Sequence, residues 1–168
     1  MSVKISVKMK VEYMYDFLLY HNYTHFSGLM SAVAGVVFLG LFIQNMMEGI
    51  TQSSWVWLMC AILLLFISPY TIKTRAKSQV ENTEMFQKPL EYEFAEDGII
   101  VEQDDAKLTV EWMEVEKAVS TQKSIILYLG RVRALIFPKE CMGDKYEEVV
   151  KMIHTHVAAK KVKIRHIH

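Results

Sequence analysis

The sequence predicts an α+β membrane protein. It would combine a two-helix transmembrane hairpin with an antiparallel β-barrel or sheet of about seven strands and a C-terminal capping helix. Two neighbouring stretches, 26–47 and 49–72, contain no charged residue. Strict alternation of apolar and polar residues marks 2–13 and returns after Pro89, as expected for half-buried strands. An apolar stripe at helical spacing follows Pro138.

The overall composition excludes several classes of protein. The chain has 168 residues, enough for one small domain with a membrane element. Lys plus Arg and Asp plus Glu number 19 each, so no general attraction to nucleic acid is expected. Cys60 and Cys141 stand far apart and predict no disulfide framework. No cleavable signal peptide is expected, because the first apolar run begins only near residue 26.

Residues 1–13 are predicted to form a strand that joins the later strands. A single strand before a membrane helix has no local partner, so its partners must come from farther along the chain. Residues 14–26 carry aromatic side chains at near-helical spacing. Tyrosine is typical of membrane–water boundaries, so an interfacial helix is predicted. The alternative is an ordinary amphipathic helix beneath the soluble domain.

Two transmembrane helices are predicted at 27–47 and 54–72. Each stretch has about the length needed to cross a hydrocarbon core of ~30 Å as α-helix. Ser27, Ser31 and Gly35 recur at four-residue steps on the first helix, and small residues at this spacing let helices approach closely. The neighbouring helix would be either the second span or the same helix of another copy, which would make a homodimer.

Basic residues predict the orientation of the hairpin. The loop 44–54 has no Lys or Arg, whereas both flanks of the hairpin carry several. The positive-inside rule therefore places both termini in the cytoplasm. The basic residues expected near anionic headgroups of the bilayer are Lys73, Arg75, Lys77, Lys160, Lys161, Lys163 and Arg165. The alternative is that they only determine the topology.

The remainder of the chain is predicted to be a soluble domain. Residues 73–88 form a helical extension or linker, which Pro89 ends. Residues 89–160 contain six short strands and then an amphipathic helix, and 161–168 form a basic tail. The side chains expected to face inward from the first and third of these strands are Leu90, Tyr92, Phe94, Leu108, Val110 and Trp112.

These strands and motifs resemble known families. With the N-terminal strand as a seventh, the strand count and terminal helix resemble the pleckstrin-homology-like (PH-like) barrel. The segments Tyr92–Ile99 (YEFAEDGI), Leu108–Trp112 (LTVEW) and Ile136–Lys139 (IFPK) resemble the YcxB-like family of bacterial membrane proteins. Cys141 and Met142 depart from the aromatic residue expected after Pro-Lys. The resemblance implies a domain anchored in the bacterial plasma (inner) membrane, with no assigned activity and no catalytic residue.

The sequence contains no recognised catalytic motif. It has no phosphate-binding glycine loop, no nucleophile elbow and no paired-cysteine or zinc-protease signature. We therefore expect no enzyme and no cofactor. His21 and His25 would share one face of a helix and are candidates for a metal site. No third ligand is obvious, and the alternative is that both are polar anchors in the interfacial segment.

Together these features predict a membrane-anchored cytoplasmic PH-like module with a binding or regulatory role. It would recruit a protein or peptide partner at the inner membrane, for example along an exposed strand edge. The alternative is an immunity or stress factor that protects the membrane against a toxic peptide. That alternative rests on an analogy of architecture with bacteriocin self-immunity proteins.

Overall fold

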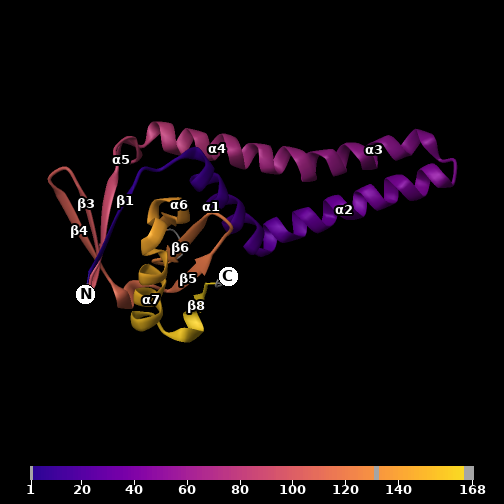
Figure 1. The fold of residues 1–168 in the computed structure, drawn as a ribbon. Coiled ribbons are helices and arrows are strands. Elements are labelled where there is room, and N and C mark those ends of the chain that lie inside the picture. The colour runs from indigo at the N-terminus through magenta and orange to yellow at the C-terminus, as the bar shows by residue number, and fades with distance from the viewer. Residues whose placement is uncertain (1, 131–132, 165–168) are drawn as a thin grey trace. The chain divides into compact units, whose positions relative to one another are not determined.

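The computed structural model describes residues 2–130 and 133–164, and the chain divides into two compact units (Figure 1). The two-sheet unit comprises residues 1–17 and 78–168, and the hairpin unit comprises residues 18–77. The boundaries fall inside α1 (Val11–Thr24) and inside α4 (Ser68–Asn82). The hairpin unit is therefore an insertion in the sequence of the two-sheet unit.

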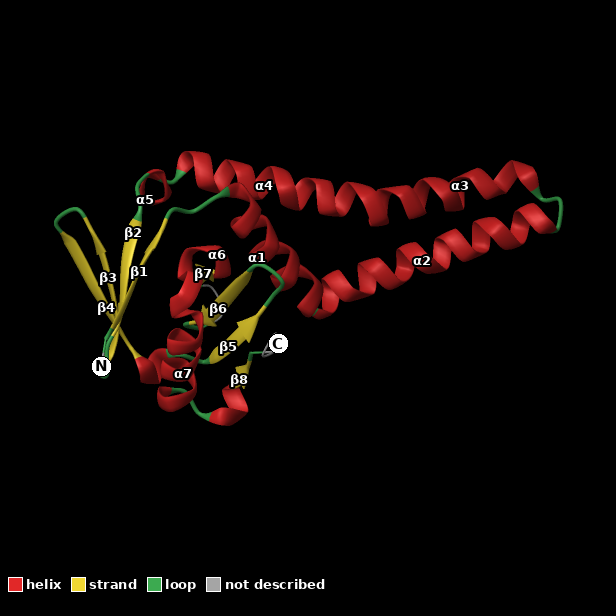
Figure 2. Cartoon of the chain, in the orientation of Figure 1, coloured by secondary structure: helices red, strands yellow, loops and turns green. Residues whose placement is uncertain are grey.

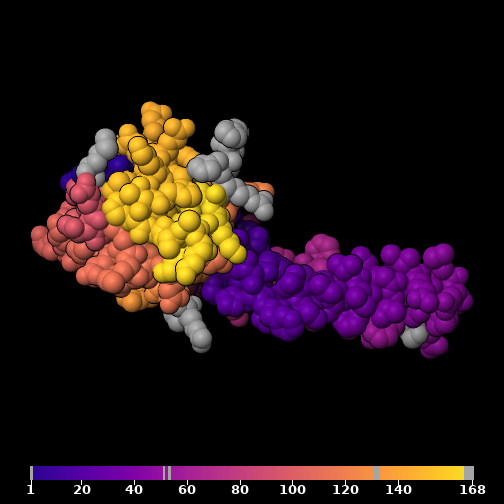
Figure 3. All heavy atoms as spheres, turned by 90° about the horizontal axis from the view of Figure 1, so that it is seen from below, coloured from indigo at the N-terminus to yellow at the C-terminus, as the bar shows by residue number. Residues whose placement is uncertain are grey.

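Two long apolar helices make up most of the hairpin unit. α2 (Phe26–Met47) is followed by α3 (Thr51–Ile62), which continues through a π-helical turn (Leu63–Ile67) into α4. Aromatic rings pack between α2 and α3, with ring centroids 5.5 Å apart for Phe38 and Trp57. In Figure 3 their side chains form one continuous body, in purple. Phe26–Met47 and Ser54–Asn82 are both long and apolar enough to cross a membrane.

The π-helical turn has a local cause. Pro69, the second residue of α4, has no N–H, so a helix cannot keep its regular hydrogen bonding just before it. A single π turn accommodates that defect within an otherwise continuous helix. The turn brings Leu64 and Leu65 against Gly35, where an added Cβ would lie 2.7 Å from Leu65 Cδ2.

The two-sheet unit contains two four-stranded sheets (Figure 2). The first has the order β1-β2-β3-β4, with β1 (Val3–Val7), β2 (Leu90–Phe94), β3 (Gly98–Gln103) and β4 (Ala106–Glu111). The second has the order β7-β6-β5-β8, with β5 (Lys117–Ser120), β6 (Ser124–Tyr128), β7 (Ala134–Pro138) and β8 (Val162–Lys163). All pairings are antiparallel except that of β5 with β8.

The N-terminal strand does pair with strands from the later part of the chain. β1 runs antiparallel to β2, with Ile5 opposite Tyr92. The strand is shorter than predicted, because α1 already begins at Val11 rather than after residue 13. Burial nevertheless alternates as far as Met9. The helix expected at 14–26 is therefore longer at its start and ends at Thr24, and α2 begins at Phe26.

Of the two predicted alternatives, a barrel or a sheet, the residues that the structure describes form open sheets and no closed barrel. β4 and β7 are each the last strand of their sheet and do not pair with each other. The expected basic tail also differs, since Val162 and Lys163 pair with β5 as an eighth strand. The chain passes between the sheets through a 3₁₀ turn (Trp112–Glu114), where a capping box joins Glu111 and Glu114. The fold is thus α+β with two open sheets.

Short helices connect and cover the sheets. α4 ends at Asn82, and α5 (Glu84–Gln87) leads into β2, so the segment predicted as 73–88 is helical but interrupted. After β7 come α6 (Lys139–Met142), a 3₁₀ turn (Gly143–Lys145) and α7 (Tyr146–His156). A further 3₁₀ turn (Ala159–Lys161) precedes β8.

One hydrophobic core joins the two sheets and α7. Phe94 and Phe137 are fully buried, with ring centroids 5.0 Å apart, and Tyr92 contacts the same Phe137 ring edge-on at 5.0 Å. α7 contributes Val149, Val150 and Ile153 to this core. The expected capping helix is therefore packed on the sheets, as its apolar stripe predicts.

Candidate binding cavity

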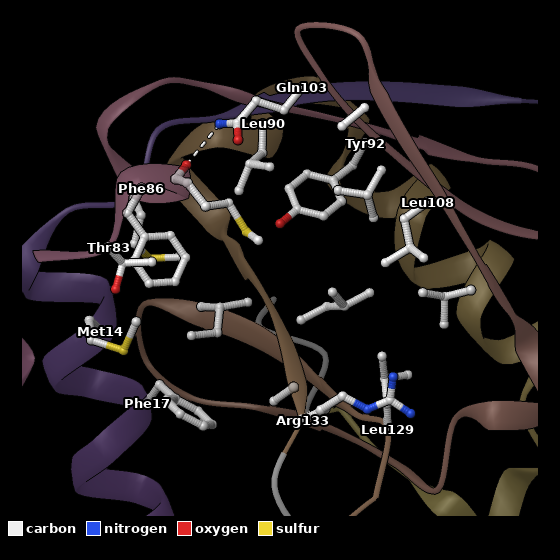
Figure 4. A pocket seen from close by; sticks show the side chains of 18 of the residues that line it. Met14, Phe17, Thr83, Phe86, Leu90, Tyr92, Gln103, Leu108, Leu129 and Arg133 are labelled. Carbon is white, nitrogen blue, oxygen red and sulfur yellow. Dashed lines mark hydrogen bonds between the residues drawn. The ribbon is translucent and has the colours of Figure 1, made fainter. Parts of the chain in front are cut away.

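The two-sheet unit contains a cavity of about 550 Å³ (Figure 4). Its walls come from α1, the end of α4, α5, the inward face of the first sheet and the β7 edge of the second. The described lining residues are Met9, Met14, Phe17, Gln79, Thr83, Met85, Phe86, Leu90, Tyr92, Val101, Gln103, Ala106, Lys107, Leu108, Val110, Leu129, Arg133, Ala134, Leu135 and Ile136.

Most of the lining is apolar, and the sheet register explains why. Tyr92, Val101 and Leu108 stand opposite one another on neighbouring strands and so share one face. Leu108 is nevertheless 60% exposed, and Met85 is 53% exposed. Large apolar side chains that line a cavity yet remain accessible mark its open side. The cavity is therefore an apolar recess that reaches the surface.

Tyr92 brings a polar group to this apolar recess. The residue is only 4% exposed, and its hydroxyl points into the cavity (Figure 4). The described part of the chain supplies no hydrogen-bond partner for that hydroxyl. Burial raises the pKa of Tyr92 to about 12, so the hydroxyl keeps its proton at neutral pH. Tyr92 can therefore donate a hydrogen bond to a molecule in the cavity.

Gln103 has a structural role in the same wall. Its Nε2 donates to the carbonyl of Met85 at 2.8 Å, and the carbonyls of Lys88 and Pro89 lie at 3.3 and 3.4 Å. These contacts hold α5 and the start of β2 against β3. The amide group is thus engaged with the backbone and shapes the cavity.

Arg133 is the lining residue that can bring positive charge to the cavity. Its guanidinium lies 3.9 Å from Glu114 Oε2, and the two side chains are 72% and 41% exposed. Lys107 lies on the opposite face of β4 from Leu108, and its ammonium is 2.6 Å from Glu102. No carboxylate occurs among the described lining residues. The described lining therefore includes two cationic side chains and no carboxylate, with Glu114 beside Arg133.

The histidines predicted as metal candidates lie in the hairpin unit. The rings of His21 and His25 touch edge-on, with centroids 4.4 Å apart. Burial, and to a smaller extent the neighbouring His25, lowers the pKa of His21. Within residues 2–130 and 133–164, no group of three or more possible ligands gathers around a metal site. The two rings are thus close together, but a third ligand is not placed beside them.

The basic residues expected at the bilayer surface differ in their surroundings. Lys73, Arg75 and Lys77 are exposed on α4, and Lys160 and Lys163 are exposed near β8. Lys161 instead donates to the carbonyl of Val115 at 2.9 Å and so connects the last 3₁₀ turn to the segment just before β5. Arg165 lies outside the described residues.

The small residues predicted to lie at the helix–helix contact differ in their burial. Gly35 is buried and lies against Leu65 within the same hairpin. Ser31 is half-buried and Ser27 is exposed. Close approach to the second apolar helix therefore occurs at Gly35.

Comparison with known proteins gives one match. The family model described as YcxB-like protein matches residues 94–153, from the end of β2 into α7. This range includes the LTVEW and IFPK segments, so the resemblance to that family is confirmed over 94–153. No curated protein and no solved structure matches the chain.

Proposed function

We propose that this chain, which carries a YcxB-like segment, is a membrane-anchored binding module. The observation behind the proposal is the hairpin, in which two consecutive charge-free helices interrupt a folded unit that contains an apolar cavity. The hairpin would cross the bilayer twice. The two-sheet unit would be held at the membrane by both ends of the insertion.

Exposure of apolar side chains supports insertion. Only 11% of the residues in each apolar window are buried, which is unlike the core helix of a soluble protein. Val36 and Phe66, well inside the two helices, are 62% and 68% exposed. Soluble monomers rarely expose contiguous apolar patches larger than a few hundred Å². A bilayer would cover these side chains, while the helices satisfy their own backbone hydrogen bonds.

The distribution of charge supports a cytoplasmic two-sheet unit. The 44–54 loop has no Lys or Arg, whereas Lys73, Arg75 and Lys77 are exposed on the helix that leaves the hairpin. Under the positive-inside rule, both termini would lie in the cytoplasm of a bacterium with the hairpin in its plasma membrane. The same cations would attract anionic headgroups.

The sheet arrangement supports a PH-like architecture and a place for a partner. Seven antiparallel strands followed by a packed helix agree with the strand count and terminal helix on which the PH-like proposal rests. β4 is an edge strand with exposed residues at Ala106–Thr109. A protein or peptide partner would add a strand along this edge, using its unpaired backbone groups.

Topology mapping of the full chain in a bacterial host tests the anchoring. A periplasm-active reporter fused within residues 48–50 should be active, and the same reporter after the C-terminus should be inactive. The chain should also stay with membranes after alkaline extraction. Extraction into the soluble fraction, or equal reporter activity at both sites, would show that the hairpin does not span the membrane.

Site-specific crosslinking in native membranes tests the partner. A photo-crosslinking amino acid at Thr109 on β4 should give a discrete product. The same amino acid at Lys151, exposed on α7, provides the control and should not give that product. Identical products at both positions, or none at Thr109, would rule out recruitment along β4.

A further inference from the structure

We propose that the cavity of the two-sheet unit binds a lysophospholipid, a lipid with one acyl chain, an ester group and an anionic phosphate. The acyl chain would occupy the apolar recess, the ester oxygen would accept from Tyr92, and the phosphate would pair with Arg133. This inference goes beyond the proposed anchoring, because the cavity lies wholly within residues of the two-sheet unit.

The size and lining of the cavity point to an acyl chain. A volume of about 550 Å³ lies within the range of roughly 300–1,000 Å³ typical of small-molecule sites. The inner wall is formed by aliphatic, methionine and aromatic side chains such as Met14, Phe17 and Leu135. A buried peptide would bring an N–H and a C=O with every residue, and each would need a partner. A hydrocarbon chain has no such requirement.

Tyr92 explains why the ligand should carry an oxygen beside the chain. A purely hydrocarbon ligand would displace water from the Tyr92 hydroxyl and leave it without a partner, which is unfavourable for a buried donor. An ester carbonyl accepts one hydrogen bond and needs no donor in return. The phenol ring is fixed by its edge-on contact with Phe137, so the direction of the hydroxyl is set by the core.

Arg133 is the reason for proposing that the ligand carries an anionic phosphate. Its separation of 3.9 Å from Glu114 is long for an ion pair, and both side chains are solvated. A guanidinium forms paired hydrogen bonds with phosphate, which are stronger than such a surface contact. No carboxylate occurs among the described lining residues, and a phosphate would take the place of Glu114 beside Arg133.

The test uses the full chain in phosphatidylcholine nanodiscs with a lysophosphatidic acid that carries a diazirine in its acyl chain. After irradiation, mass spectrometry locates the crosslinked residues. We expect crosslinks on β4 and on the segment around Met85, in addition to any on the hairpin. Unlabelled lysophosphatidic acid in excess should remove the cavity crosslinks, whereas partition of the probe beside the hairpin should persist.

A matched pair of variants separates the cavity from the general surface. Leu108→Asp places a negative charge at the open side of the cavity and should lower cavity crosslinking at least tenfold. Met113→Asp introduces the same charge at an 80% exposed residue that does not line the cavity, and should change it less than twofold. Both positions are exposed, so both variants are expected to fold, which circular dichroism checks. Equal effects of the two variants would overturn the proposal.

Two further variants and one competitor test the polar contacts. Tyr92→Phe keeps the packed ring and removes the hydroxyl. Arg133→Gln keeps most of an exposed side chain and removes the positive charge. In each variant, unlabelled lysophosphatidic acid should compete with the probe about tenfold less well. Palmitic acid, which has no ester or phosphate, should compete at least tenfold less well. Equal competition by palmitic acid would show a general acyl-chain site and overturn the lysophospholipid assignment. A crosslinked peptide partner in place of the probe, or no cavity crosslink, would overturn it as well.

Discussion

The Tyr13 hydroxyl donates a hydrogen bond to the carboxylate of Glu140, which lies 127 residues later in the chain. Tyr13 is in the first turn of α1 and only 3% exposed, and Glu140 lies in α6, directly after β7. Lys10 Nζ lies 3.4 Å from the same carboxylate. These contacts fasten the beginning of α1, which also lines the cavity through Met14, to the second sheet.

Removing this hydrogen bond should loosen α1. Tyr13→Phe retains the buried ring and loses only the hydroxyl, so we expect the unfolding temperature of the two-sheet unit to fall by a few degrees. Differential scanning calorimetry of the full chain in detergent measures the effect. The control is Tyr70→Phe, at a 69% exposed position in the hairpin unit, which should leave that transition unchanged. An unchanged transition in Tyr13→Phe would show that the bond does not contribute.

The same contact predicts a dependence on pH. The hydrogen bond from Tyr13, and then the nearby Lys10 charge, lower the pKa of Glu140 below its ordinary value of 4.5. A carboxyl with a lowered pKa in the folded state stabilises the fold above its unfolded pKa, and loses that contribution as pH falls through the folded pKa. The difference in stability between wild type and Tyr13→Phe should thus be largest at neutral pH and should shrink below about pH 4.5. A constant difference from pH 7 to pH 3 would contradict this assignment.

Two glycines on α2 offer a matched test of packing within the hairpin. A Cβ on Gly35 would lie 2.7 Å from Leu65, whereas a Cβ on Gly40 would meet nothing within 4 Å. Gly35→Leu should separate the helices and cost about 1–3 kcal/mol, the usual range for overpacking. Gly40→Leu should be tolerated. Thermal loss of the helical circular dichroism signal in detergent compares them, and equal midpoints would mean that Gly35 is not a contact point.

Phe94 tests the shared core of the two sheets. It is fully buried, and its ring centroid lies 5.0 Å from that of Phe137 and 6.3 Å from that of Trp112. Phe94→Ala should destabilise the two-sheet unit by about 3–5 kcal/mol, because it removes a large apolar side chain and leaves a cavity. Met113→Ala, at an 80% exposed position, should change stability by less than about 0.5 kcal/mol. Calorimetry measures both free energies of unfolding. A small effect of Phe94→Ala would show that the stability of the two sheets does not depend on this shared core.

Alternation in the sequence predicted most of the inward-facing side chains. Leu90, Tyr92 and Phe94 are all buried, as period two requires. Val110 and Trp112 are buried as predicted, but Leu108 is 60% exposed. Alternation identifies the face of a strand and not what covers that face. At Leu108 the face opens to the cavity, because β4 ends the sheet there.

The open edges and the cavity could not be read from the sequence. A count of strands is the same for a closed barrel and for two open sheets, and closure depends on whether β4 and β7 meet. The cavity lining runs from Met9 to Ile136 and combines short segments that are far apart in the chain. No local pattern relates Tyr92 to Arg133. The alternation that places Tyr92 inward was a sign in the sequence that a polar group lies in the core.

β1 precedes the hairpin insertion in the sequence and contributes to the core. We expect only its inward-facing side chains to stabilise the first sheet. Ile5 is 3% exposed and stands opposite Tyr92, whereas Lys4 points outward and its ammonium lies 3.1 Å from Glu93. Ile5→Ser should cost about 2–4 kcal/mol and increase hydrogen exchange throughout β2 and β3, because it removes buried apolar surface. Lys4→Ser removes only a solvated ion pair and should cost less than about 1 kcal/mol. Exchange measured by mass spectrometry on the full chain compares the two variants. Faster exchange in both, or in neither, would mean that β1 does not support the first sheet through Ile5.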